Sequence, residues 1–189
     1  MKITTDLSSV QIWDDLIDDK FLLDLDEESN FWDWHLSNVA NRKSFPYGNK
    51  GSHLFWSIIF DPPKKAPIET LDLYSYMSKN YLQDKFDLKM VQLNGQSLGQ
   101  NGTAHLDIVD YEKDNYTLML FLNYKWKKEW GGEFQFLSST NNNFQILKSL
   151  PFIPGRMIFF KGNIPHRGLA PTEPYIIRKT LVYRLVKNG

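Results

Sequence analysis

Residues 154–166 read PGRMIFFKGNIPH, an apolar run with a turn on either side. Proline and glycine precede the run, and glycine, asparagine and proline follow it, all of which favour turns. The four residues from Met157 to Phe160 have the apolar character and length of a short buried strand. The segment therefore predicts a strand followed by a turn that brings His166 to the mouth of a barrel.

Further short strands are expected on both sides of this one, because apolar or alternating runs recur between glycine, asparagine and proline residues. They cover 54–60, 89–94, 105–110, 116–124, 132–137, 144–147, 156–161 and 178–186. Two other segments, 9–25 and 69–83, carry apolar residues at spacings of three and four and predict amphipathic helices. This order predicts a mainly β protein with flanking α-helices, built as a β barrel or jelly roll.

The domain organisation is expected to be simple. The 189 residues contain no internal repeat, low-complexity segment or long linker, and this length suffices for one domain with a real core. We expect a single domain over 1–189, in which 1–87 supply a helical buttress and the first strands. Residues 88–187 would then form the jelly-roll core that carries the site.

Composition excludes several classes of function. Lysine and arginine number 22 and so do aspartate and glutamate, so the net charge gives no general attraction to nucleic acid or an anionic membrane. The absence of cysteine excludes disulfides and thiolate metal sites, and leaves histidine and carboxylate as the expected ligands. No stretch approaches the roughly 18 apolar residues that cross a bilayer. A cytoplasmic protein without a membrane partner is expected.

His105 and Asp107 are candidate metal ligands. In a strand, alternate side chains project to the same face, so both can reach one ion. His166 is the third candidate, because it follows the strand and turn described above. Two histidines and one carboxylate leave about three positions of an octahedral ion open, which suits non-haem iron(II). The alternative is a buried, hydrogen-bonded histidine pair beside a turn aspartate.

Arg178 is a candidate anion-binding residue at the start of the last strand. Alternation places Arg178, Thr180 and Val182 on one face of that strand. An arginine inside a barrel needs an anion, and its planar fork suits the distal carboxylate of a dicarboxylate such as 2-oxoglutarate, with Thr180 as a further donor. The alternative is an arginine paired with a surface carboxylate, and Arg184 is expected to be such a surface residue.

Taken together, residues 90–185 resemble the iron(II)- and 2-oxoglutarate-dependent oxygenase superfamily, most closely its prolyl 4-hydroxylase-like branch. The resemblance covers about half of the chain. It rests on five segments in the family's order: Leu120-Phe121-Leu122-Asn123 with Trp126, Trp130-Gly131-Gly132-Glu133, the 154–166 stretch, His105-Leu106-Asp107 with His166, and Arg178 with Thr180.

This resemblance implies a double-stranded β-helix with iron(II) at its open end, held by His105, Asp107 and His166. It also implies 2-oxoglutarate as cosubstrate and O2 as oxidant, and it allows ascorbate as a further cofactor. Oxidative decarboxylation of 2-oxoglutarate would be coupled to hydroxylation of a substrate C–H bond. Arg178 would hold the distal carboxylate.

The chain departs from the family pattern at Phe121, where many prolyl hydroxylases have a tyrosine that helps to hold this carboxylate. Another donor is therefore needed. Asn94 and Gln96 precede His105 at a spacing that resembles the alkylated-base demethylases of the superfamily, and both could point inward to the cosubstrate. The alternative is a turn, because asparagine precedes glycine there.

The primary substrate is less well defined by the sequence. A protein or peptide residue such as proline is favoured by the motif match, with a nucleic-acid base demethylase or hydroxylase, or a small-molecule hydroxylase, as the alternative. Asn94 and the cluster of Lys125, Lys127 and Lys128 favour nucleic acid, and the zero net charge opposes it. A non-catalytic jelly-roll binding module is a further alternative. Loops 45–51 and 96–103 are expected to form the substrate rim, and neither His35 nor His53 has a predicted role.

Overall fold

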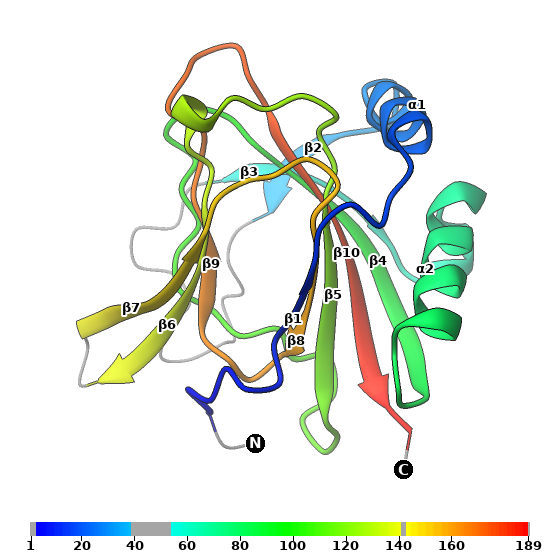
Figure 1. Cartoon of the computed structure of the whole chain (residues 1–189), viewed down its shortest axis with the longest axis vertical. Helices are drawn as coiled ribbons and strands as arrows, with labels where there is room; N and C mark the ends of the chain where they lie inside the picture. The colour runs from blue at the N-terminus through cyan, green and yellow to red at the C-terminus, as the bar shows by residue number, and fades with distance from the viewer. Residues whose placement is uncertain (1–2, 39–53, 141–142, 189) are drawn as a thin grey trace.

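The chain folds into two antiparallel sheets that face one another (Figure 1). The computed structural model describes residues 3–38, 54–140 and 143–188, so the predicted rim loop 45–51 and His53 lie outside the described residues. The larger sheet has the strand order β1 (Gln11–Trp13), β8 (Met157–Lys161), β5 (Asn115–Phe121), β10 (Arg178–Lys187), β4 (Phe86–Gln96), β3 (Phe55–Phe60) and β2 (His35–Asn38). The smaller sheet consists of β7 (Asn143–Leu150), β6 (Phe134–Thr140) and β9 (His166–Gly168).

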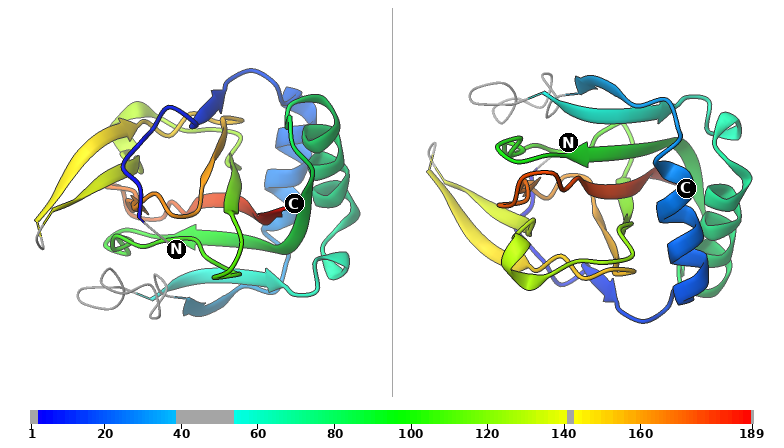
Figure 2. Two further views of the ribbon diagram at one scale, coloured as in Figure 1. Left: turned by 90° about the horizontal axis from the view of Figure 1, so that it is seen from below. Right: turned by 90° about the horizontal axis from the view of Figure 1, so that it is seen from above.

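One face of the larger sheet packs against two helices, α1 (Asp19–Ser29) and α2 (Ile68–Asn80), which lie together on that side (Figures 1 and 2). The helices bury Leu25 and Met77 against outward-facing residues of β10 such as Leu181. Tyr183 extends this contact, because its hydroxyl donates to the backbone oxygen of Thr70 at 2.6 Å. The helices therefore buttress the outside of the barrel, as predicted.

The other face of the larger sheet points to the smaller sheet. Val182 of β10 packs there with aromatic side chains of both sheets, including Phe121, Phe134 and Phe160. Because strand side chains alternate, Arg178 shares this inner face with Val182. The predicted jelly-roll arrangement is confirmed, and it places Arg178 and Thr180 of β10 between the sheets.

The predicted helix over 9–25 is wrong in its first half. Gln11–Trp13 form β1, which pairs with the edge of β8, and the helix begins only at Asp19. Asp18 caps it by accepting hydrogen bonds from the backbone of Lys20 and Phe21. Asp14, between strand and helix, is held by Arg156 at 2.7 Å and 2.8 Å. The apolar spacing over 9–18 thus does not produce a helix, because pairing with β8 and the ion pair between Asp14 and Arg156 hold this segment in an extended form.

The predicted strand over 105–110 is also wrong. His105 makes one isolated bridge, to His166, and the described chain forms no continuous ladder there. The backbone nitrogens of Val109 and Asp110 instead donate to the side-chain oxygen of Asn115, at 2.8 Å and 2.9 Å. This side chain substitutes for a neighbouring strand and turns the chain.

Among the described residues, none of the helices is both long and apolar enough to cross a membrane.

Candidate active site

A cavity of about 370 Å³ lies between the two sheets, and all seven predicted site residues line it. They are the candidate metal ligands His105, Asp107 and His166, and the candidate cosubstrate residues Arg178, Thr180, Asn94 and Gln96. Residues from β4, β9, β10 and the segment after residue 102 therefore converge on one space.

Backbone contacts hold the three candidate metal ligands together. His105 and His166 exchange backbone hydrogen bonds of 3.0 Å and 3.1 Å, and the backbone nitrogen of Asp107 donates to the oxygen of Gly162 at 2.8 Å. A side chain at Gly162 would not fit, because its Cβ would lie 2.0 Å from the backbone oxygen of Asp107. Glycine after β8 thus permits the close approach that brings His166 to the other two ligands.

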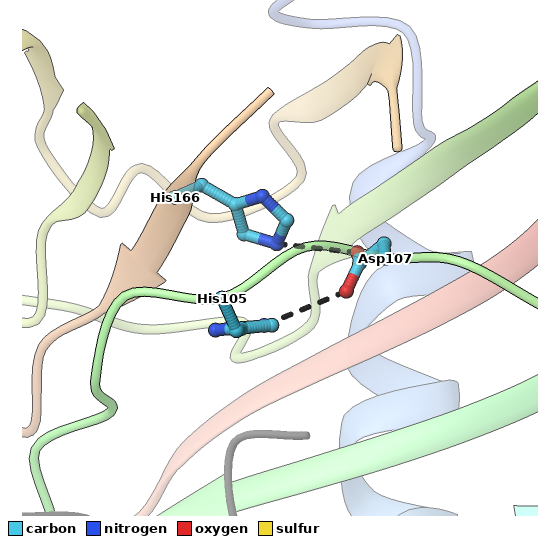
Figure 3. A group of neighbouring side chains, drawn as sticks. All are labelled: His105, Asp107 and His166. Atoms are coloured by element: carbon cyan, nitrogen blue, oxygen red, sulfur yellow. Dashed lines mark ion pairs between the residues drawn. The ribbon is translucent and has the colours of Figure 1, made fainter. Parts of the chain in front are cut away.

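The side chains of this triad converge (Figure 3). The Nε2 atom of His105 lies 3.5 Å from Oδ1 of Asp107, and Nε2 of His166 lies 3.2 Å from Oδ2. One ligand atom from each residue falls within 4.8 Å of the others, a spacing that could hold a metal ion.

The histidines are neutral and oriented for metal binding. Burial lowers the pKa of His166 to about 4 and that of His105 well below its usual range. Each Nδ1 faces a backbone oxygen, Thr103 at 2.9 Å or Ile164 at 2.8 Å, which can only accept a hydrogen bond. The proton therefore sits on Nδ1, and both Nε2 lone pairs face the carboxylate of Asp107. The imidazole lone pairs and the carboxylate oxygens therefore face one another in a buried site, where a cation between them could bind all three side chains.

Arg178 is a buried cation with one open hydrogen-bonding position. Its side chain donates from Nε to the oxygen of Gly132 at 2.8 Å and from Nη1 to Oε1 of Gln96 at 3.0 Å, whereas Nη2 is buried without a partner. Burial lowers the pKa of Arg178 to about 9, so it remains positive at neutral pH. Phe121 and Phe152 flank the guanidinium, with ring centroids 5.4 Å and 5.2 Å away. This arrangement leaves Nη2 available to an anion.

The other predicted cosubstrate residues differ in their contacts. The side-chain nitrogen of Gln96 donates to the backbone oxygens of Gln100 and Gly168, at 2.8 Å and 3.1 Å, so its amide supports Arg178. Thr180 lies opposite Asn94 across the β4–β10 ladder. Asn94 accepts hydrogen bonds from two other amides of the cavity wall, those of Gln92 at 2.6 Å and Asn38 at 3.3 Å.

The expectation that Arg184 is a surface residue is wrong. Its side chain is 13% exposed, lines the cavity and contacts Oδ2 of Asp107. It also donates to Oγ1 of Thr117 at 3.0 Å, and Thr117 in turn donates to the same Oδ2 at 2.8 Å. Burial lowers the pKa of Arg184 to about 9. Sequence reasoning assigned neither Thr117 nor Arg184 to the site. Strand alternation could have indicated Arg184, because it puts Arg184 on the same face of the strand as Arg178.

The turn at 130–132 contributes to the site through its backbone. Gly131 and Gly132 have positive φ angles of 65° and 81°, which glycine adopts without a steric penalty. The oxygen of Gly132 is the one that holds Arg178. Of the clustered lysines, Lys127 lies over the ring of Trp130, at 5.4 Å from its centroid. His35 lies exposed on β2 and is not among the residues that line the cavity.

Comparison with known proteins identifies a family. The model of the 2OG-Fe(II) oxygenase superfamily matches residues 90–183, whereas no curated protein sequence matches the chain. A solved prolyl-4-hydroxylase from Pseudomonas putida is similar, with a TM-score of 0.60 and 14% identity over 97% of this chain and 96% of that chain. A prolyl hydroxylase from Trichoplax adhaerens, in complex with a hypoxia inducible factor peptide, has a TM-score of 0.64 and 14% identity over 96% and 84%.

A third solved structure is the non-heme alpha ketoglutarate dependent epimerase SnoN from nogalamycin biosynthesis, with a TM-score of 0.66 and 9% identity over 94% of this chain and 78% of that chain. These neighbours have the double-stranded β-helix fold, which confirms the predicted fold. Membership of this family also implies the cofactor iron(II) and the cosubstrates 2-oxoglutarate and O2. This chain belongs to the 2OG-Fe(II) oxygenase superfamily and is a 2-oxoglutarate-dependent iron(II) dioxygenase.

Proposed function

We propose that His105, Asp107 and His166 hold the iron(II) of this dioxygenase and that Arg178 holds the distal carboxylate of 2-oxoglutarate. The observation that supports the metal assignment most directly is the convergence of two neutral imidazole lone pairs on one buried carboxylate. The unpartnered Nη2 of Arg178 supports the cosubstrate assignment, because an incoming carboxylate would complete its hydrogen bonds. Both features line the same cavity.

The chain's own residues would orient the reactants. Bound iron, together with 2-oxoglutarate and O2, would supply the oxidant for a substrate C–H bond. Arg178 would fix the far end of the cosubstrate, and the rings of Phe121 and Phe152 would exclude water from that contact. We assign Gln96 to holding Arg178, and Thr180 to donating toward the cosubstrate in place of the tyrosine hydroxyl that Phe121 lacks. Asn94 would lie beside Thr180 on the same wall.

For the primary substrate we propose a protein or peptide residue such as proline. Two prolyl hydroxylases are among the similar solved structures, one of them with a bound peptide. The cavity wall away from the metal ligands also carries the amides of Asn38, Gln92 and Asn94. Amides donate and accept hydrogen bonds as peptide groups do. The zero net charge of the chain argues against nucleic acid.

A small-molecule substrate is the second candidate, because the TM-score of SnoN, 0.66, lies close to those of the two prolyl hydroxylases, 0.60 and 0.64. A nucleic-acid base is the third candidate, supported by the position of Asn94 in the cavity wall and by the cluster of Lys125, Lys127 and Lys128.

The test combines succinate release with product mass. The protein would be loaded with iron(II) and 2-oxoglutarate and mixed with proline-containing peptides, small hydroxylatable metabolites and methylated oligonucleotides. We expect succinate and an added oxygen atom on a peptide, and neither from Asp107→Ala. His35→Ala, which changes an exposed histidine on β2, is the matched control and should retain both. Oxygen added only to a metabolite or only to an oligonucleotide would overturn the peptide proposal.

A further inference from the structure

We propose that Thr117 and Arg184 are positioning residues that hold Oδ2 of Asp107 and thereby leave Oδ1 for the metal. The proposal rests on the proposed function, because it concerns the same metal site. It adds two residues that neither the metal triad nor the cosubstrate pocket requires.

Two side chains from the larger sheet contact the same oxygen of Asp107. Thr117 donates to Oδ2 at 2.8 Å, and Arg184 contacts the same oxygen. Nε2 of His105 lies 3.5 Å from Oδ1, and Nε2 of His166 lies 3.2 Å from Oδ2. The contacts from Thr117 and Arg184 therefore distinguish the two oxygens, and we assign Oδ1 to the ion.

The two donors lie on paired strands of the larger sheet, whereas Asp107 lies outside the ladders. Thr117 and Arg184 are register partners on the neighbouring central strands β5 and β10, and their side chains are joined by a hydrogen bond of 3.0 Å. Asp107 lies in a segment that has an isolated bridge but no ladder. Rotation of its carboxylate is therefore opposed mainly by this pair of strand residues.

Orientation of this carboxylate determines how many metal positions are free. Two imidazole nitrogens and one carboxylate oxygen leave about three positions of an octahedral ion open, as the chelating cosubstrate and O2 together require. A carboxylate that bound through both oxygens would occupy one of those positions. Donors that occupy Oδ2 oppose this second contact. Arg184 also supplies a positive charge beside a buried carboxylate.

The test uses Co(II) as an oxygen-insensitive probe of the metal site in the full chain. Its dissociation constant would be measured by isothermal titration, and its visible absorption, which depends on coordination number and geometry, would be recorded alongside. We expect Arg184→Met to weaken Co(II) binding by about 10- to 100-fold, as the loss of outer-shell contacts to a metal ligand does, and to change the absorption. Thr117→Val should act in the same direction, whereas Thr117→Ser retains the hydroxyl and should resemble the wild type.

Lys179→Met is the matched control. Lys179 is also a buried cation of β10, but it pairs with Asp26 on the helix side of the sheet. Its loss should lower stability and leave both the Co(II) affinity and the absorption unchanged. If Arg184→Met does not fold, as judged by circular dichroism, Thr117→Val and Thr117→Ser carry the comparison.

Unchanged or tighter Co(II) binding with an unchanged spectrum in Arg184→Met and Thr117→Val would overturn the positioning role alone. Failure of the wild-type protein to bind Co(II), or Co(II) binding that survives Asp107→Ala, would instead overturn the proposed metal site.

Discussion

At neutral pH the guanidinium of Arg178 is charged, buried to 2% exposure and only partly satisfied by the protein. Nε and Nη1 have protein acceptors, and Nη2 has none. Burying a charged donor without an acceptor is unfavourable. A ligand carboxylate that removes this cost would gain affinity from it, as the proposed role of Arg178 in cosubstrate binding requires.

Replacing Arg178 by alanine should separate cosubstrate binding from metal binding. We expect the affinity for 2-oxoglutarate to fall by tens- to thousands-fold, since an unpaired buried carboxylate loses about 2 to 5 kcal/mol. Metal affinity should change little, and lysine should recover only part of the loss because it lacks the planar fork. Isothermal titration under anaerobic conditions gives both constants. Arg167→Ala, which removes a cation bound to Gln135 next to His166, is the control, and equal loss in both variants would contradict the assignment.

The two buried histidines should make the metal-free protein sensitive to acid. The folded pKa of His166 is about 4 and the unfolded value is about 6.5, so the unfolded chain binds the extra proton. Stability is therefore complete above pH 6.5 and is lost as the pH falls toward 4. The expected loss from His166 between pH 7 and pH 5 is roughly 2 kcal/mol.

Urea denaturation at several pH values, with a chelator present, measures this loss. His166→Gln should flatten the dependence between pH 4 and 6.5, and His35→Gln, at an exposed histidine, should leave it unchanged. An equally steep dependence in His166→Gln would show that other groups cause it.

Most of the site was predictable at the level of single residues, because the relevant chemistry is tied to residue type and spacing. Strand alternation alone placed Arg178 and Thr180 on the inner face. Arg184 was misplaced because its environment depends on Asp107, which approaches from a distant segment. Gln96 was predicted to contact the cosubstrate, and its contact with Arg178 depends likewise on packing between strands.

At the level of elements, β10 joins the site to the helical layer. Arg178 faces the cavity, and the next residue, Lys179, faces the end of α1. There its Nζ atom donates to the oxygen of Asp26, to Ser29 and to Asn30 at 2.7 to 2.8 Å, and pairs with the carboxylate of Asp26 at 2.5 Å. A cation at the carboxyl end of a helix also interacts favourably with the helix dipole.

Lys179→Met should therefore loosen α1 from the sheet. We expect a loss of about 2 to 3 kcal/mol in the free energy of unfolding, somewhat below the cost of breaking a fully buried pair because Asp26 is 19% exposed. Lys187 is also on β10 and forms an exposed pair with Asp84. Lys187→Met should therefore cost much less stability than Lys179→Met. Urea denaturation of the two variants compares them, and similar losses would mean that the buried pair has no special role.

Elements that the sequence did not predict are short and depend on partners. β1, β2 and β9 have three or four residues each, and β1 and β2 are edge strands whose pairing comes from distant segments. The segment from His105 alternates like a strand, but Asn115 occupies its backbone donors beyond Ile108. Long central strands such as β5 and β10 were predictable because their own apolar pattern reflects burial on both faces.

At the level of the whole molecule, the site depends on the two sheets being closed together. His166 comes from the smaller sheet, and Arg178 and Arg184 come from the larger one. Asp107 comes from the segment that connects β4 to β5. A ligand that binds these groups binds only the folded arrangement. Metal and cosubstrate should therefore stabilise the entire fold by mass action.

Binding of metal and cosubstrate together should raise the temperature at which the protein unfolds. With Mn(II) and 2-oxoglutarate each at about one hundred times its dissociation constant, each ligand should add about 2.7 kcal/mol to the free energy of unfolding. For a chain of this length, each kcal/mol raises the unfolding midpoint by about 2 to 4 °C. Differential scanning calorimetry should therefore show a rise of about 10 to 20 °C with both ligands present.

Two variants test which residues the stabilisation by each ligand depends on. Asp107→Ala should abolish nearly all of the rise, because it removes the anionic metal ligand and with it the ion that the cosubstrate chelates. Arg178→Ala should lose the cosubstrate part and keep the metal part. If Asp107→Ala kept the full rise, the ligands would be stabilising the fold from somewhere other than the cavity between the sheets.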